Sequence, residues 1–84
     1  MTKLEPIIKI LKEVVGDRTV PRNIRTAVEQ AKNDLEDDSK DIDVKLSSAI
    51  SNLDEIINDP NIPMYTRTQI WNIVSMLECV KQES

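Results

Sequence analysis

The chain is an internal duplication. When its 84 residues are shifted by 42 positions without a gap, the two halves align with eleven identical pairs, and four further pairs exchange Val for Ile. Ungapped matching along the whole length predicts one domain, residues 1–84, built from repeat one (1–42) and repeat two (43–84). The identical apolar pairs are Leu4/Leu46, Ile8/Ile50, Leu11/Leu53 and Leu35/Leu77.

Each repeat is predicted to be a helix, a short loop and a second helix, because apolar residues recur at the i, i+3, i+4 and i+7 spacing of one helix face. A Thr-x-x-Glu capping pattern, Thr2 with Glu5, precedes the first helix, and Gly16 is expected to end it. The four predicted helices span residues 3–15, 20–37, 43–58 and 62–82.

The loop inside each repeat carries the same pattern, Asp-x-x-[Val/Ile]-Pro-x-x-x-Arg-Thr. Thr19 and Asn61 occupy the same repeat position, and both residue types are favoured as helix N-caps. Pro21 and Pro63 then fall at the start of the following helix, where proline is tolerated.

Two such hairpins can stack as a solenoid or close onto each other. Solenoids generally need three or more repeats to be stable, and this chain has two. We therefore predict an all-α fold in which the two duplicated helix–loop–helix hairpins form a four-helix bundle.

Parts of the sequence also resemble known families. The duplicated turns Val20 to Arg25 and Ile62 to Arg67, and the stretch Leu-x-x-Ile-Ile-x-Asp-Pro-Asn-Ile-Pro from Leu53 to Pro63, resemble a small uncharacterised archaeal family, number 0147. The resemblance covers the whole chain and implies an all-helical fold and an archaeal source, with no established activity to carry over. Each half is more loosely similar to a HEAT-type helical repeat.

The composition disfavours catalysis. The chain has no His, one Gly and one Cys, Cys79. A chain without His lacks the commonest general base near neutral pH and the Ser-His and Cys-His nucleophile pairs. The acidic run 36–43 lacks the spacing and the glycine of a calcium loop, so a solvated linker is favoured. We expect no enzyme activity, no cofactor and no metal.

The charge and hydropathy suggest a location. The net charge is −4, and no apolar run approaches the length of a membrane span. We expect a cytoplasmic protein that does not bind membranes. Nucleic acid is disfavoured as a partner, although the basic residues of repeat one leave it as an alternative. These residues are Lys9, Lys12, Arg18, Arg22 and Arg25.

Arg25 and Arg67 stand at the same repeat position, as do Asp17 and Asp59. In one interpretation, an Asp–Arg or cap interaction braces each loop. In the other, the two arginines frame an anion site across a pseudo-twofold axis.

The fourth helix distinguishes the repeats. Glu29 in repeat one corresponds to Trp71 in repeat two, Arg22 to Met64 and Lys32 to Val74. The widened apolar arc admits two interpretations: a central helix with Trp71 in the core, or a surface that binds another chain. We favour an interface at Met64, Trp71 and Val74, because Trp and Met are enriched at interfaces. The predicted function is protein–protein interaction or scaffolding, with a homodimer or another protein partner at the fourth helix.

Overall fold

The computed structural model describes residues 4–83 as four helices, with no strand in that range. The all-α prediction is confirmed, and no helix boundary differs from the predicted one by more than two residues. The expected cap at Thr2 lies outside the described residues. The helices are α1 (Glu5–Val15), α2 (Arg22–Glu36), α3 (Ile42–Ile57) and α4 (Met64–Glu83).

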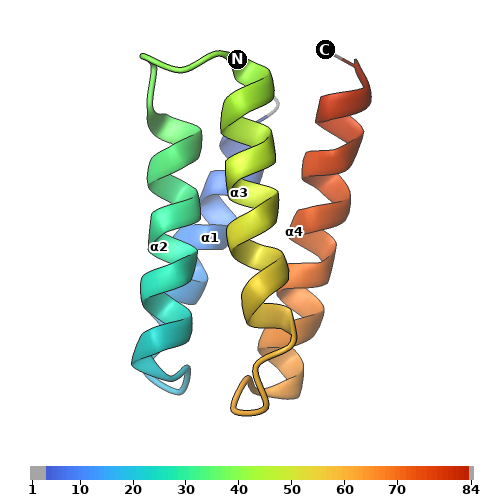
Figure 1. Ribbon diagram of the computed structural model, residues 1–84. Coiled ribbons are helices and arrows are strands. Elements are labelled where there is room, and N and C mark those ends of the chain that lie inside the picture. Colours follow the sequence, from blue (N-terminus) through green and yellow to red (C-terminus); the bar gives the residue numbers. More distant parts are fainter. Residues whose placement is uncertain (1–3, 84) are drawn as a thin grey trace.

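The helices run alternately up and down around a common core (Figure 1). Each helix packs against the next one along the chain, and α1 packs against α4, so the four close into a ring. A solenoid would instead stack equivalent helices, α1 on α3 and α2 on α4, and neither pair is in contact within the described residues. The bundle prediction is confirmed, whereas the idea of α4 as a central helix that touches all three others is wrong.

The core consists of the apolar residues that the repeat keeps in place. Leu11, Leu53 and Leu77 are fully buried, and Leu35 is nearly so. Burying a side chain of this size contributes about 1.5–3 kcal/mol to folding. The duplicated apolar pattern therefore holds both hairpins in the same core.

All three loops contain the same hydrogen-bonded turn. Each contains an aspartate whose Oδ1 accepts a hydrogen bond from the backbone N–H two residues later. Asp17 accepts from Thr19 (2.9 Å), Asp37 from Ser39 (3.0 Å) and Asp59 from Asn61 (2.8 Å). The backbone carbonyl of the same aspartate accepts a hydrogen bond from the N–H three residues later, which belongs to Val20, Lys40 or Ile62. Aspartate is favoured in turns for this ability to bond its own backbone two residues on.

The expected N-caps are wrong, because the helices begin later. Thr19 is bound to Asp17 through both its backbone N–H and its hydroxyl, and α2 begins three residues further on. Pro21 is the N-cap of α2, with extended backbone, and its carbonyl accepts the Arg25 N–H. Pro63 and Arg67 repeat this bond before α4, where Asn61 likewise lies within the loop.

Gly16 does cap the end of α1, but its φ of −83° is right-handed. The freedom of glycine to adopt positive φ is therefore not used at this position.

Candidate functional site

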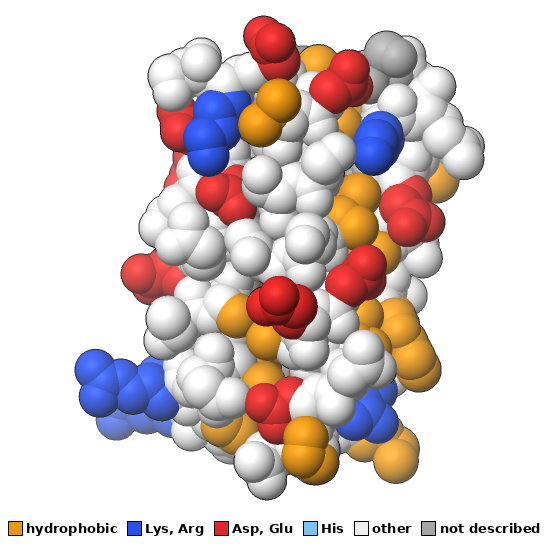
Figure 2. Space-filling view, in the orientation of Figure 1, with side chains coloured by type: hydrophobic (Ala, Val, Ile, Leu, Met, Phe, Trp, Pro, Cys, Tyr) orange, Lys and Arg blue, Asp and Glu red, His pale blue; other side chains and the backbone are white. Residues whose placement is uncertain are grey.

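The outer side of α4 carries exposed apolar and aromatic side chains. Met64 is 81% exposed, Tyr65 71% and Trp71 55%. Figure 2 shows hydrophobic side chains grouped on the α4 side, toward the end where α3 joins α4. We call the exposed residues of this stretch the α4 face: Met64, Tyr65, Thr68, Trp71, Asn72 and Ser75.

The α4 face is also uncharged. In α1, by contrast, four of the five exposed residues before the C-cap are charged: Glu5, Lys9, Lys12 and Glu13. The one charged residue between positions 64 and 77 is Arg67, which is half-buried and bonded to the α3–α4 loop. Few charges together with Met, Tyr and Trp are the composition found at the centres of protein interfaces.

Of the three predicted interface residues, two lie on the surface and one lies in the core. Met64 and Trp71 are seven residues apart, so they lie on the same side of α4, and both are exposed. Val74 is 8% exposed and belongs to the core. It lies four residues after the buried Ile70, so both face the same side of the helix. Trp71 is thus a surface residue, and Val74 is not part of the α4 face.

Sequence reasoning missed Tyr65. Its repeat equivalent is Asn23, just as Arg22 corresponds to Met64 and Glu29 to Trp71. All three repeat-one residues are exposed on α2. A large apolar residue at a position that the other repeat exposes is the signal that would have found Tyr65.

The two equivalent arginines bind backbone carbonyls. Nε of Arg67 donates to the Ile57 carbonyl (3.1 Å) and Nη2 to the Asp59 carbonyl (3.4 Å). Nε of Arg25 donates to the Val20 carbonyl (3.1 Å). These bonds brace the α1–α2 and α3–α4 loops through backbone carbonyls, rather than through the side chains of Asp17 and Asp59.

The basic residues of repeat one do not form a uniformly positive surface. Arg22 and Arg25 line a shallow hollow of about 260 Å³ together with Val15, Thr26 and Glu29. The Glu29 carboxylate reduces the attraction of this hollow for a phosphate.

The acidic α2–α3 loop has a structural role. The hydrogen bond from the Ser39 hydroxyl is the main cause that holds the pKa of Asp37 below its ordinary value, and the bond from the Ser39 backbone N–H adds to it. Both bonds favour the ionised side chain that forms the turn. Within residues 4–83, no group of three His, Cys, Asp or Glu side chains is placed to hold a metal ion. No described helix is long and apolar enough to cross a membrane.

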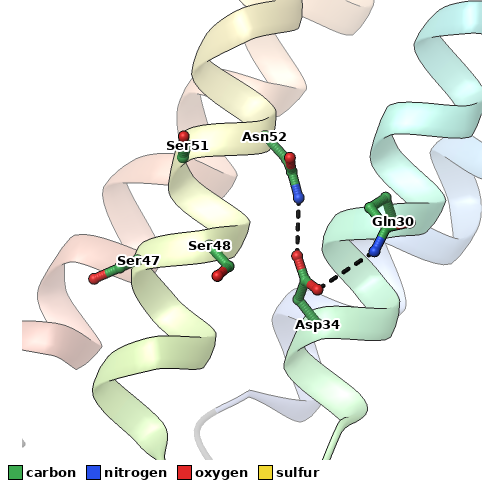
Figure 3. Close-up of a pocket in the computed structure, with 6 residues that line it drawn as sticks. All are labelled: Gln30, Asp34, Ser47, Ser48, Ser51 and Asn52. Atoms are coloured by element: carbon green, nitrogen blue, oxygen red, sulfur yellow. Dashed lines mark hydrogen bonds between the residues drawn. The ribbon is translucent and has the colours of Figure 1, made fainter. Parts of the chain in front are cut away.

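A second surface feature lies between α2 and α3. An open groove of about 480 Å³ is lined by Gln30, Asp34, Ser47, Ser48, Ser51 and Asn52, which we call the α2–α3 groove. Asp34 is 6% exposed, and its Oδ2 accepts a hydrogen bond of 2.8 Å from Asn52 (Figure 3). Sequence reasoning assigned no role to Asp34, because the burial of a carboxylate is set by the packing of the helices.

Comparison with known proteins shows relatives along almost the full length. The chain is 51% identical over 78 residues to the UPF0147 protein of Methanocaldococcus jannaschii, covering 93% of this chain and 84% of the relative. It is 52% identical over 79 residues to the UPF0147 protein of Thermococcus kodakarensis, covering 93% and 95%.

Two crystal structures share the fold. One, of the protein of unknown function MMP1188, is 53% identical with a TM-score of 0.87, covering 90% of this chain and 86% of that one. The other, from Thermoplasma acidophilum and of the same family, is 33% identical with a TM-score of 0.89, covering 93% and 92%. The model of the Uncharacterised protein family (UPF0147) matches residues 1–80. The resemblance read from the duplicated turns is confirmed: the chain belongs to the archaeal family UPF0147.

Proposed function

We propose that this protein works by binding rather than by catalysis, and that its α4 face pairs with the α4 face of a second copy. The observation that carries the proposal is the uncharged outer surface of α4 between Met64 and Ser75, which exposes Trp71. Leaving an indole half in water forgoes much of its burial free energy, and a partner surface would recover it.

A second copy is the occupant that the charges favour. The chain has a net charge of −4, so two copies repel each other over most of their surfaces. Two α4 faces can meet without placing like charges together, because neither face is charged. An antiparallel arrangement of two α4 helices, each about 30 Å long, would bring both Trp71 side chains near a twofold axis.

The test compares two substitutions of an exposed apolar residue by glutamate. Trp71→Glu places on α4 the residue that α2 already carries at the equivalent position, Glu29, so helix formation is retained. Val44→Glu is the matched control, because Val44 is 49% exposed on α3, outside the α4 face.

The measurement is solution mass by sedimentation equilibrium over a range of concentrations, with circular dichroism on the same samples. The wild type and Val44→Glu are expected to reach twice the 9.6 kDa of one chain, while Trp71→Glu stays at 9.6 kDa with unchanged helicity. A wild type that remains at 9.6 kDa at the highest concentration, or a Trp71→Glu variant that still doubles its mass, would refute the proposal.

A further inference from the structure

The α2–α3 groove carries a second inference, independent of the α4 face. It lies along the seam of α2 and α3, and α2 is not in contact with α4 within residues 4–83, although the lining residue Ser47 is bonded to Lys81 of α4. All six lining residues are polar, one is a carboxylate and none is basic. Any ligand that enters this groove therefore meets hydrogen-bonding groups and a negative charge.

The Asp34 carboxylate at the base of the groove is only partly satisfied. Its Oδ2 has one short bond, from Asn52. Its Oδ1 has two long contacts, 3.4 Å to Gln30 Nε2 and 3.6 Å to Lys40 Nζ. A carboxylate accepts about four hydrogen bonds, and a buried one is strongly stabilised by a cation. Lys40 is more than a third exposed, so it supplies that charge weakly.

The fold itself does not require this carboxylate. In the alignment of the two repeats, Asp34 corresponds to Met76, and Asn52 corresponds to Ile10. Met76 and Ile10 belong to α4 and α1, the other pair of helices that joins the two repeats, and both are partly buried against the core. The same architecture is thus built once with an apolar pair and once with a polar pair, and the polar pair lies beside an open groove.

Small side chains keep the groove open. Ser48 and Ser51 line it from α3, while Ser47 points away from α2 and its Oγ accepts a hydrogen bond from Lys81 (Figure 3). In repeat one the counterparts of Ser48 and Ser51 are Pro6 and Lys9. Repeat two therefore has short hydroxyl side chains where repeat one has a larger apolar and a basic side chain.

We infer that the α2–α3 groove binds a cationic N–H group, the ammonium or guanidinium end of a side chain or of a small organic cation. The incoming cation pairs with Oδ1 of Asp34 in place of Lys40, and the groove hydroxyls accept its remaining hydrogen bonds. Such a contact is charge-assisted and therefore stronger than a neutral hydrogen bond.

The experiment is a titration followed by amide chemical shifts on uniformly ¹⁵N-labelled protein. The probes are propylammonium, propylguanidinium and neutral propanol, followed by capped pentapeptides with a central Lys or Arg among glycines. We expect saturable shifts at the side-chain amides of Gln30 and Asn52 and at the backbone of residues 47–52 with the cations, and none with propanol.

Three variants locate the site. Asp34→Asn keeps the shape and removes the charge, and Ser48→Met keeps the charge and fills the groove, so both should weaken binding at least tenfold. Lys40→Ala removes the competing ammonium group and should tighten binding several-fold. Asp54→Asn, an exposed acid on α3 outside the groove, is the matched control and should bind as the wild type does.

Two positive outcomes identify the source of the cation. Tenfold tighter binding of a peptide than of its small cation supports a partner protein, and equal binding supports a free small cation. Shifts that do not saturate, or that persist unchanged in Asp34→Asn, would overturn the inference. Because the shifts are local to α2 and α3, this result is read separately from the mass measurements on α4.

Discussion

Asn52 donates a 2.8 Å hydrogen bond to the buried carboxylate of Asp34, and the two residues that correspond to this pair in the repeat are Ile10 and Met76. The α2–α3 contact is therefore polar at positions where the repeat-equivalent residues on α4 and α1 are apolar and packed against the core. Buried polar pairs contribute little to stability compared with apolar pairs of similar size, but breaking one by removing a single partner is costly.

Asn52→Ile alone is expected to lower the free energy of unfolding by about 1–3 kcal/mol, because it removes the short hydrogen bond from a buried carboxylate. The double variant Asp34→Met/Asn52→Ile, which copies the α1–α4 pair, should return to within about 1 kcal/mol of the wild type or exceed it. Urea denaturation of both single variants and the double variant gives the coupling energy. A double variant that loses the sum of the two single losses would show that the pair is not a unit.

The arginine braces should differ in strength. Lysine cannot match the fork of a guanidinium group, and Arg67 uses two of its nitrogens on two carbonyls where Arg25 uses one. Arg67→Lys is expected to lower the free energy of unfolding by about 1–2 kcal/mol, and Arg25→Lys by about half as much. Chemical denaturation measures both losses. Equal losses would mean that the second bond of Arg67 contributes nothing.

Gly16→Ala is expected to stabilise the protein by about 0.4–1 kcal/mol. The φ of Gly16 suits alanine, and an added Cβ would lie 3.5 Å from the Lys12 carbonyl oxygen, an ordinary contact. The gain comes from the reduced freedom of the unfolded chain. Thermal unfolding measures it, and Asn58→Ala at the equivalent cap of α3 is the control that should show no such gain. A lower melting temperature for Gly16→Ala would contradict this account.

The loop aspartates link stability to acid pH. The Thr19 hydroxyl, followed by the Thr19 backbone N–H, lowers the pKa of Asp17 below its ordinary value in the folded protein. The ionised form is therefore favoured by folding. Its stabilising effect is present above the unfolded pKa of about 3.9 and is lost as the pH falls through the lower folded pKa. We expect stability to decrease as the solution is acidified below about pH 4.

Thr19→Ala should raise the pKa of Asp17 toward its ordinary value and leave that of Asp37 unchanged, because Asp37 is bound by Ser39. Ser39→Ala should do the reverse. Titration of the side-chain carboxyl ¹³C signals measures both values. An Asp17 pKa that does not respond to Thr19→Ala would mean that the hydroxyl is not the dominant cause.

The sequence predicted the fold because the repeat and the helical periodicity select the same residues. Leu11 and Leu53 are identical, are spaced for one helix face and are fully buried, so two independent signals agree. The start of α2 was predicted two residues too early because Thr19 is suited to two different hydrogen bonds. Its hydroxyl suits an N-cap, but in the structure the hydroxyl donates its hydrogen bond to Oδ1 of Asp17, two residues earlier.

The candidate sites were predicted less well, because exposure depends on the packing angle of a helix. Val74 and Trp71 are three residues apart on the same apolar arc, yet one lies in the core and the other is 55% exposed. The α2–α3 groove depends on which two helices meet. Asp34 and Asn52 are 18 residues apart, and nothing in the periodicity states that their helices pack side by side.

The turn shared by the three loops lies at every reversal of chain direction. Asp17, Asp37 and Asp59 each set the same reversal of direction, at alternate ends of the bundle. Each of these turns is closed by hydrogen bonds within four consecutive residues, and the packing of α1 on α4 then completes the ring of helices. Reversal of direction is thereby encoded three times in short local segments, while the closure of the bundle rests on packing between the distant helices α1 and α4.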